Sequence, residues 1–399
     1  MPQIQKVIGL MSGTSLDGID AALLETDGEA VARPGLGLTQ PYDGETRALL
    51  RQALTDARAM ADGRGEADAP VPHAIREAER LSTEAHVRAV RALLEKTGLG
   101  PADIALIGFH GQTILHRPAR RLTWQIGDGA LLARSTGIDV VNDFRSADVK
   151  AGGQGAPLVP LYHAALVRSS LASEANGGGG GRGTPRRAKA GGEEKTTALA
   201  EPVAVVNIGG VANVTYINGG DVLAFDTGPG NAPIDDWMQR HTGKVVDEGG
   251  ALARTGRIDQ AALAAMLAHP FFDRKPPKSL DRQDFGFAAV EGLGAADGAA
   301  TLAAFTAAAI ARAREHFPQA PAAWVVCGGG RHNDFLMERL RALLASPVRR
   351  AEDVGWNGDC LEAEAFAYLA LRAKKGLPLS LPATTGVPRP MTGGVLHRH

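Results

Sequence analysis

The chain has 399 residues, of which 44% are hydrophobic, and its 43 Lys and Arg residues balance 44 Asp and Glu residues. This composition excludes a disordered chain, and the balanced charge gives no overall basic field for binding nucleic acid. Two cysteines cannot form a disulfide framework, and neither a membrane-spanning apolar stretch nor a signal peptide is visible. We therefore expect a cytoplasmic protein of about two domains. The 50 glycines, where roughly 28 would be usual, need a structural explanation.

Strands and helices alternate through the first part of the chain. Residues 6–27 predict a strand, a glycine turn and a second strand, which is typical of a hairpin. Leucines and valines at helical spacing predict helices at 46–60 and 73–96. The pattern continues with strands at 104–109, 124–128 and 138–144, a helix at 129–136 and an apolar helix from Leu158.

A change in composition interrupts this alternation. Residues 172–200 are rich in Gly, Ala and charged residues without a periodic apolar face, so we expect a flexible surface insertion. Its Arg/Lys cluster leaves a nucleic-acid or lipid contact as the alternative. Beyond it we expect strands at 203–226 and 322–327 and helices at 231–242, 259–268, 298–316, 333–344 and 359–374. Such alternation indicates an α/β protein with two mixed sheets.

Four glycine turns, at 12–18, 207–210, 226–231 and 327–330, directly follow apolar strands. Glycine at these places allows positive φ angles and lets a phosphate approach the backbone N–H groups closely. A turn that runs into a helix adds the partial positive charge of the helix N-terminus. A single such turn is most often an ordinary tight turn, but four at strand ends favour a phosphate-binding cleft. We expect much of the glycine excess to lie in these turns.

The common nucleotide-binding motifs are missing from the chain. There is no P-loop, no G-x-G-x-x-G spacing and no protein-kinase motif series. The pattern fits instead an arrangement in which paired hairpin loops, one from each domain, hold ATP across a cleft. The ribonuclease-H-like fold of sugar kinases, actin and Hsp70 uses that arrangement. In that architecture the first hairpin carries an aspartate near the metal, and Asp17 occupies the matching place.

Asp226 is the strongest candidate for acid–base chemistry. It ends the apolar run VLAF and directly precedes TGPGN. A carboxylate beside a phosphate-binding loop is well placed to accept a proton from an attacking hydroxyl or water. From spacing alone, capping of the following turn or helix explains Asp226 equally well.

Weaker candidates stay open between a binding role and a structural one. Arg145 and Asp148 could orient a sugar or carboxylate, or form an ion pair with each other. His110 could bind substrate or be satisfied within the fold. Asn207 and Asn213 lie beside glycine turns, where they could contact a ligand or shape the turn.

Several ordered blocks of the sequence carry a family resemblance. They closely resemble the anhydro-N-acetylmuramic acid kinase family, and they extend over most of the chain. The blocks include GLMSGTSLDGID (9–20), GFHGQT (108–113), GGQGAPLVP (152–160), NIGGVANVT (207–215), FDTGPGN (225–231) and VCGGGRHNDFLM (326–337). The insertion at 172–200 departs from the short connection that the family leads us to expect.

The resemblance implies an α/β fold of two ribonuclease-H-like domains, with mixed β-sheets flanked by helices and with ATP and sugar in the interdomain cleft. It implies an ATP- and Mg²⁺-dependent kinase of amino sugar metabolism, acting in peptidoglycan recycling. The enzyme would hydrolytically open 1,6-anhydro-N-acetylmuramic acid and phosphorylate it to N-acetylmuramic acid 6-phosphate. A kinase of another amino sugar and a non-enzymatic nucleotide switch of the same fold are the alternatives.

The resemblance also assigns roles to residues. Asp226 would activate the water, and Glu362 is a candidate for binding the sugar. The comparison with the sugar kinase fold adds Asp17, which would hold the metal through water, and Arg145 and Asp148 stay candidates for binding the sugar from the residues themselves. The residues expected to bind ATP are Gly13, Thr14, Ser15, Leu16, Asp17, Gly18, Ile19, Asp20, Asn207, Gly209, Gly210, Gly328, Gly329 and Gly330.

We expect the chain to divide into two domains. Residues 1–140, completed by the C-terminal segment 372–399, would form the first, and residues 141–371, with the insertion at 172–200, the second. The resemblance further suggests a homodimer. We expect neither a nucleic-acid partner nor a membrane.

Overall fold

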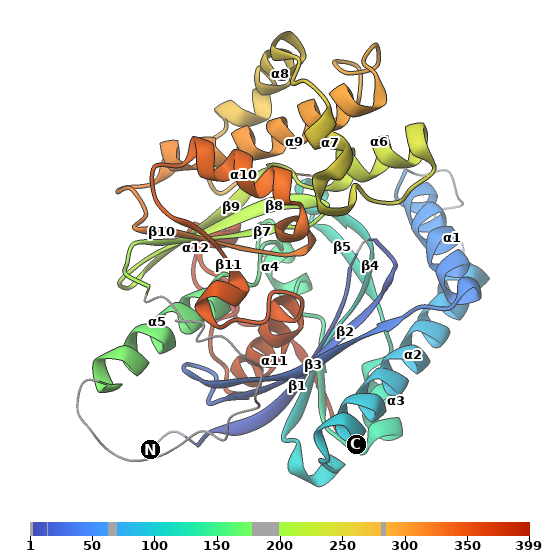
Figure 1. Cartoon of the computed structure of the whole chain (residues 1–399). Coiled ribbons are helices and arrows are strands. Elements are labelled where there is room, and N and C mark those ends of the chain that lie inside the picture. Colours follow the sequence, from blue (N-terminus) through green and yellow to red (C-terminus); the bar gives the residue numbers. More distant parts are fainter. Residues whose placement is uncertain (1–2, 14, 63–69, 178–198, 281–284) are drawn as a thin grey trace.

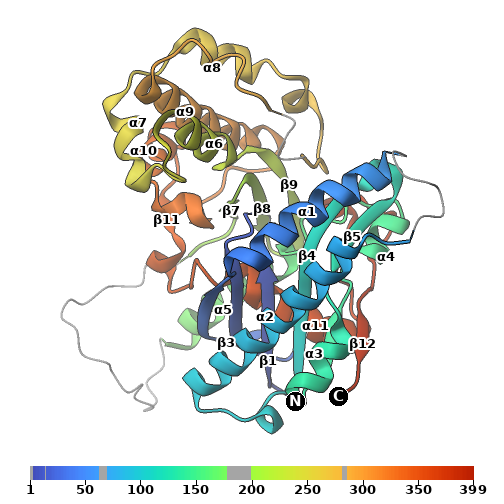
Figure 2. The same cartoon turned by 90° about the vertical axis from the view of Figure 1, so that its right-hand side faces the viewer.

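The structure, a computed structural model, describes residues 3–13, 15–62, 70–177, 199–280 and 285–399. Two β-sheets lie in two lobes, and helices cover their outer faces (Figure 1). A view turned by 90° shows the same two lobes, with long helices of the N-terminal region along one of them (Figure 2). The candidate site residues lie where the two lobes meet.

The first sheet has the strand order β12-β6-β4-β1-β2-β3, and β5 pairs with β4. Strand β1 is antiparallel to β2 and parallel to β4. The strands are β1 (Gln5–Ser12), β2 (Gly18–Thr26), β3 (Val31–Pro41), β4 (Leu106–Arg117), β5 (Leu122–Ile126), β6 (Val140–Asn142) and β12 (Val395–His397).

The second sheet repeats this order as β11-β10-β7-β8-β9. Its strands are β7 (Val203–Ile208), β8 (Val211–Asn218), β9 (Asp221–Pro229), β10 (Ala323–Cys327) and β11 (Val348–Arg350). In both sheets three strands form an antiparallel meander, and two further strands add in parallel beside the first. This is the ribonuclease-H strand order, so the expected fold of two such domains is confirmed.

Helices cover the outer face of each sheet. On the first sheet these are α1 (Gly44–Ala61), α2 (His73–Thr97) and α3 (Gly129–Thr136). On the second, α9 (Ala295–Arg312) and α10 (Asp334–Leu343) pack on the strands, and α6 (Ala232–Thr242), α7 (Ala251–Thr255) and α8 (Gln260–Leu267) pack on α9. The short helices α4 (Ser146–Lys150) and α12 (Pro382–Thr385) lie in connections.

A hydrophobic core between the two sheets joins the lobes. Helices α5 (Pro160–Gly177) and α11 (Leu361–Lys374) form it together with inward-facing residues of both sheets, such as Val7, Val205 and Val325. Strands β1 and β2 of the first sheet are covered on both faces, which explains why their apolar residues run almost without interruption. The two lobes therefore share one core and are not separate units joined by a linker.

Glycines in the strands let α11 lie directly on the first sheet. A Cβ atom at Gly9 of β1 would collide with the carbonyl oxygen of Ala363, and one at Gly108 of β4 with that of Phe366. Part of the glycine excess thus serves the packing of a helix on strands, in addition to the strand-end turns where we expected it.

Two of the differences from the sequence expectation concern β3 and α5. Strand β3 was not expected, because Pro34, Gly35 and Gly37 are residues that usually interrupt strands. Strand β3 pairs with β2 at the edge of the sheet, where such residues are tolerated. The expected insertion at 172–200 begins later than we placed it, because α5 continues to Gly177. Its residues 178–198 lie outside the described residues.

The expected division into domains stays a prediction. Its boundary at residue 140 falls at the start of β6, a strand of the first sheet. Helix α11, which it assigns mostly to the second domain, packs on β1, β2 and β4. Strand β12, from the C-terminal segment, pairs with β6.

Candidate active site

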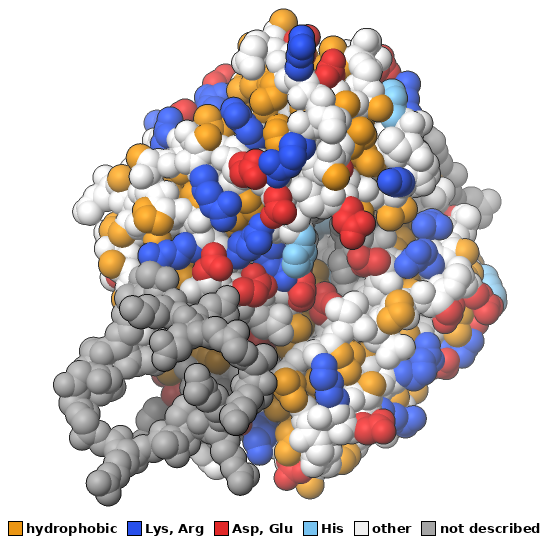
Figure 3. Space-filling view, viewed as in Figure 1, with side chains coloured by type: hydrophobic (Ala, Val, Ile, Leu, Met, Phe, Trp, Pro, Cys, Tyr) orange, Lys and Arg blue, Asp and Glu red, His pale blue; other side chains and the backbone are white. Residues whose placement is uncertain are grey.

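A pocket with a cavity volume of about 100 Å³ lies between the two sheets. Both sheets and α11 contribute to its wall, so a ligand here would touch both lobes. The lining residues are Met11, Arg145, Ala156, Pro157, Leu158, Val159, Asn213, Asp226, Glu362 and Phe366. On the face shown in Figure 3, acidic and basic side chains gather where the lobes meet.

Asp226 lies in this pocket near the end of β9 and is 7% exposed. Its backbone N–H donates to the carbonyl of Lys278 at 2.9 Å, and its Oδ2 accepts from the N–H of Leu280 at 2.8 Å. Burial raises the pKa of Asp226 to about 7, although the Leu280 N–H and the Arg145 charge act in the opposite direction. The carboxylate is therefore both fixed in orientation and able to gain or lose a proton near neutral pH.

Arg145 brings a buried positive charge to the same pocket. Its Nε donates to Nε2 of His110 at 3.0 Å, and its terminal nitrogen donates to the carbonyl of Gly155 at 2.6 Å. The other ring nitrogen of His110 donates to the carbonyl of Gly111, so the ring is neutral with Nδ1 protonated. Burial and the Arg145 charge lower the pKa of His110 well below its ordinary value. His110 thus orients Arg145 without adding charge.

Glu362 lies in the first turn of α11 and also lines the pocket. Its Oε1 accepts a hydrogen bond from Nδ2 of Asn207 at 2.8 Å. Burial raises the pKa of Glu362, opposed by Arg145 and the Asn207 bond. A residue predicted to bind ATP and one predicted to bind the sugar are thus in direct contact.

Asp148, the third residue predicted to bind the sugar, is not among the pocket-lining residues. One of its oxygens accepts from the N–H of Gly155 at 2.6 Å, and the other accepts from the hydroxyls of Ser380 and Thr385. These bonds tie the turn after α4 to the C-terminal segment. Its sugar-binding role stays a prediction, and its contacts give it a structural one.

The turn between β1 and β2 holds most of the residues predicted to bind ATP. Leu16 has a positive φ of 57°, and Arg47 donates to the carbonyls of Leu16 and Asp17. Nε2 of Gln112 donates to the carbonyl of Gly13 at 3.2 Å. Thr14 lies outside the described residues. The turn is therefore shaped largely by side chains that reach it from α1 and β4.

Two carboxylates accompany this turn. Asp17 accepts from the hydroxyl of Ser15 at 2.7 Å, and Asp20 accepts from the hydroxyl of Thr39 at 2.6 Å. Burial raises the pKa of Asp20 to about 6, and the negative charges of Glu362 and Asp17 contribute to this. The turn of the first sheet thus brings negative charge toward the first turn of α11.

The glycine turns of the second sheet lie against one another. The N–H of Asn231 donates to the carbonyl of Gly209 at 2.7 Å, and that of Gly230 donates to Gly210 at 3.0 Å. Gly328 has a positive φ of 74°, and a Cβ atom there would collide with Oδ1 of Asn207. Bare backbone from three turns therefore meets at one edge of the sheet, which is a surface suited to phosphate oxygens.

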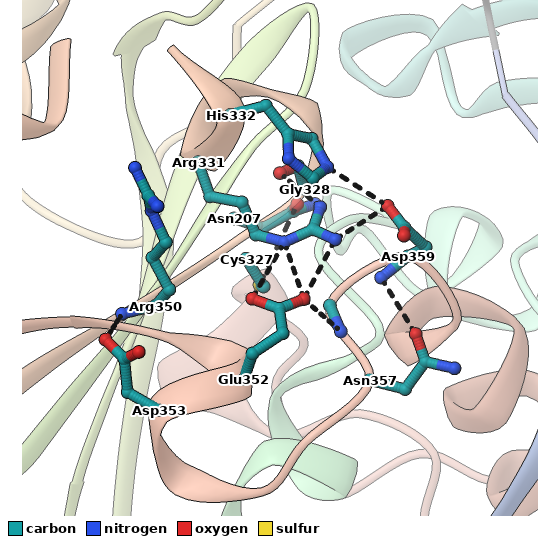
Figure 4. Close-up of polar contacts among 11 residues, drawn as sticks. Asn207, Cys327, Gly328, Arg331, His332, Arg350, Glu352, Asp353, Asn357 and Asp359 are labelled. Carbon is teal, nitrogen blue, oxygen red and sulfur yellow. Dashed lines mark hydrogen bonds and ion pairs between the residues drawn. The ribbon is translucent and has the colours of Figure 1, made fainter. Parts of the chain in front are cut away.

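A buried arginine, Arg331, supports this edge and was not foreseen from the sequence (Figure 4). Its side chain is 1% exposed and donates to the carbonyl of Gly328 at 3.0 Å. It also forms ion pairs with Glu352 at 2.9 Å and Asp359 at 2.7 Å, and His332 approaches the same oxygen of Asp359. Arg331 follows the glycine turn directly, but no pattern in the sequence indicates that its side chain folds back under it.

The site residues fit a nucleotide with Mg²⁺. The three glycine turns offer backbone to phosphate, and Asp17 and Asp20 are oxygen donors of the kind that Mg²⁺ prefers. Among the described residues there is no group of three or more His, Cys, Asp or Glu side chains placed to hold an ion. An Mg²⁺ ion here would therefore take further ligands from water and phosphate, as it usually does.

Known proteins similar to this chain match it over nearly its whole length. The family model for anhydro-N-acetylmuramic acid kinase matches residues 5–181 and 174–399. The anhydro-N-acetylmuramic acid kinase of Rhodospirillum rubrum is 52% identical over 389 residues, which cover 97% of this chain and 92% of the relative. That of Methylobacterium nodulans is 51% identical over 404 residues, which cover 98% of this chain and 100% of the relative.

Solved structures with a similar fold are distant in sequence. An activator of 2-hydroxyisocaproyl-CoA dehydratase from Clostridium difficile with bound ADPNP is 12% identical, with a TM-score of 0.42 over 93% of this chain and 96% of that one. A ROK family glucokinase from Streptomyces griseus in complex with glucose and AMPPNP is 15% identical, with a TM-score of 0.37 over 92% and 99%. Because these TM-scores are low, the fold assignment rests on the strand order of the two sheets.

None of the helices in the described residues combines the length and apolar character needed to cross a bilayer.

Proposed function

The chain belongs to the anhydro-N-acetylmuramic acid kinase family, and from this premise we propose the reaction that its pocket carries out. The enzyme converts 1,6-anhydro-N-acetylmuramic acid, water and ATP into N-acetylmuramic acid 6-phosphate and ADP. The sugar is a fragment of peptidoglycan, so the reaction belongs to cell-wall recycling in the cytoplasm. A homodimer is part of this proposal and is tested by the molar mass in solution.

The position of Asp226 is the observation that carries the proposal. Its carboxylate lies in the pocket between the sheets, and burial raises its pKa to about 7. A group with a pKa near the working pH suits general-base catalysis. A water molecule loses a proton to Asp226 while its oxygen bonds to the anomeric carbon. The bond from that carbon to the bridging oxygen breaks at the same time.

The second half of the reaction uses the oxygen that is freed. The 6-oxygen, once released from the anomeric carbon, attacks the γ-phosphorus of ATP, and ADP leaves. Little covalent chemistry is required of the protein in such a transfer, because positioning and electrostatic stabilisation supply most of the catalysis. This explains how the enzyme can lack a P-loop lysine.

Arg145 and Glu362 set the charge of the sugar-binding part of the pocket. Burial lowers the pKa of Arg145 to about 10, with Glu362, Asp148 and Asp226 opposing this, so Arg145 remains a cation at neutral pH. A buried guanidinium can bind a sugar oxygen or the lactyl carboxylate that distinguishes muramic acid from other amino sugars. We assign Arg145 to that contact and Glu362 to the boundary between sugar and nucleotide.

ATP would lie across the glycine turns of both sheets. The turn 13–20 of the first sheet and the turns at 209–210 and 328–330 of the second would approach its phosphates. Asp17 and Asp20 are the residues that would hold Mg²⁺, Asp17 through water. Mg²⁺ bound there with ATP would neutralise charge on the phosphates.

The test is a kinase assay on anhydro-N-acetylmuramic acid in ¹⁸O-labelled water. We expect ADP release that depends on the sugar and one ¹⁸O atom at the anomeric carbon of the product. Phosphorylation without incorporated label would indicate a kinase of another hydroxyl group. ATP hydrolysis independent of any sugar would indicate a nucleotide switch.

A further inference from the structure

Asn213 of β8 lies directly beside the catalytic carboxylate. In the register of the second sheet it faces Asp226 of β9 on one side and Asn207 of β7 on the other. Directly opposed residues of antiparallel strands have their side chains on the same face of the sheet. Asn213 and Asp226 both line the pocket. Three polar side chains thus form a row across the sheet next to the pocket.

The amide of Asn213 lacks the partner that its position requires. Its Oδ1 is buried and has no hydrogen-bond donor within the described part of the chain. Asn207, its neighbour in the row, donates through Nδ2 to Glu362. A buried amide oxygen without a donor is rare in proteins and points to an occupant of the pocket that supplies one.

The contacts of Asp226 indicate what that occupant is. One oxygen of Asp226 already accepts the N–H of Leu280, which leaves the other for a ligand in the pocket. Facing residues on neighbouring strands have Cβ atoms about 4.5–5.5 Å apart, so one water molecule can reach both side chains. Water has two hydrogens to donate, and the two acceptors take one each.

We propose that Asn213, together with Asp226, holds the attacking water. This inference rests on the proposed function, because that reaction requires a water at the anomeric carbon. The water gives one proton to Asp226 and keeps the other, which it donates to Oδ1 of Asn213. Its lone pair then points into the pocket toward the anomeric carbon. The second hydrogen stays on the new anomeric hydroxyl, so Asn213 does not change its protonation.

The kinetic test compares Asn213→Ala with the wild type and with Asn218→Ala, a control at the far end of the same strand. We expect kcat for the sugar-dependent reaction to fall about 10- to 100-fold in Asn213→Ala, as for the loss of one positioning contact. The KM for the sugar should change less than about threefold, because ground-state binding of the sugar does not use this residue. Asn218→Ala should behave as the wild type.

A second readout separates a water-holding role from a structural one. Methanol has one O–H hydrogen, so it can satisfy Asp226 but not both acceptors. In Asn213→Ala the methyl group of methanol can occupy the space that the amide leaves. Mass spectrometry of products formed in aqueous methanol should therefore show a ratio of methyl glycoside 6-phosphate to N-acetylmuramic acid 6-phosphate at least about tenfold higher than in the wild type.

The outcomes are distinct. A tenfold rise in the KM for the sugar with an unchanged product ratio would mean that Asn213 binds the sugar, and it would overturn this inference while leaving the proposed function intact. Unchanged kcat and product ratio in a folded Asn213→Ala variant would overturn it as well. A wild-type enzyme that shows no sugar-dependent ADP release would overturn the proposed function and this inference with it.

Discussion

The first hairpin turn of the first sheet and that of the second occupy equivalent places in the same strand order. The turn between β1 and β2 is held by side chains that come from other elements, with Arg47 and Gln112 bonded to its carbonyls. The turn between β7 and β8 consists of Gly209 and Gly210, whose carbonyls accept backbone N–H groups from the next glycine turn. A Cβ atom at Gly230 would collide with the carbonyl of Gly209.

The difference shows two ways of placing backbone at the proposed phosphate site. In the first sheet, several replaceable side chains each contribute a hydrogen bond. In the second, the shape depends mainly on glycines that pack closely, Gly230 against backbone and Gly330 against the side chain of Ile208. We therefore expect substitutions in the second sheet to lower activity or ATP affinity more than those in the first. The carboxylate of the second sheet, Asp226, comes first.

The largest effect is expected for Asp226→Asn. The amide can still accept the Leu280 N–H but cannot take a proton, so kcat should fall about 10²–10⁴-fold while ATP still binds. In the wild type, kcat should rise with pH through about 7, where Asp226 ionises. Unchanged turnover in Asp226→Asn would falsify its role as the base.

Asp226→Asn should raise the thermal stability of the protein, although it lowers kcat. The folded-state pKa of Asp226 lies above its ordinary value, so the protonated form is favoured by folding. The contribution of protonated Asp226 to the free energy of unfolding is complete at low pH and is lost as pH rises through about 7. Asp226→Asn should therefore melt at a higher temperature than the wild type at pH 8, with the difference vanishing near the ordinary pKa of aspartate.

The glycine arrangement of the second sheet can be broken with one methyl group. A Cβ atom at Gly330 would collide with Ile208, whereas the nearest atom to one at Gly329 is Nδ2 of Asn231 at 3.6 Å. Overpacking costs about 1–3 kcal/mol, so Gly330→Ala should lower ATP affinity about 10- to 100-fold. Calorimetric titration with an ATP analogue measures this. The neighbouring Gly329→Ala is the matched control, and equal losses in both variants would contradict the packing argument.

Substitution of Arg331 tests whether the glycine turns of the second sheet also depend on a side chain for their shape. Arg331→Met removes the hydrogen bond to Gly328 but leaves Glu352 and Asp359 hydrated, since their side chains are 49% and 62% exposed. The loss of one such bond is worth about 1–2 kcal/mol, so we expect the KM for ATP to rise about tenfold with the KM for the sugar unchanged. Arg254→Met, which breaks an exposed pair with Glu338, should change neither value.

A smaller effect is expected at the turn of the first sheet. Gln112→Ala removes the bond to the carbonyl of Gly13 and the bond from the hydroxyl of Ser12, but Arg47 still holds the carbonyls of Leu16 and Asp17 in the same turn. We expect the KM for ATP to rise only about threefold, below the effect of a typical lost hydrogen bond. An effect as large as that of Gly330→Ala would remove the contrast between the two turns.

The smallest effect is expected for deletion of residues 178–198. This segment lies outside every sequence block of the family resemblance, and loops tolerate large changes in length at small cost. Helix α5 continues to Gly177, so a deletion should start after it. Turnover and melting temperature should stay near those of the wild type, and a large loss of turnover would show that the segment takes part in catalysis.

The sequence predicted the elements whose local signals agree with the fold. Apolar runs mark the strands, and the glycine turns and Asp226 come where such runs end. The fold class and the position of Asp226 beside a glycine turn could therefore be predicted. Long periodic helices such as α2 were likewise found within a few residues of their ends.

Features that depend on distant contacts could not be predicted. Strand β3 contains residues that usually break strands and forms because β2 offers it an edge. The side chain of Arg331 folds under its own turn because Glu352 and Asp359 are brought there by later parts of the chain. Gly9 and Gly108 let α11, which comes near the other end of the sequence, lie directly on the first sheet. No local pattern in the sequence indicates this close contact.

The shared core has a consequence for synthesis on the ribosome. Strands β1 to β4 emerge early, but the helix that covers their inner face, α11, and the strand that completes their edge, β12, are made near the end. Chains grow from the N-terminus at about 5–20 residues per second, and exposed apolar sheet promotes aggregation. The nascent first sheet therefore waits many seconds with one apolar face uncovered, which makes it a natural client for chaperones that bind growing chains.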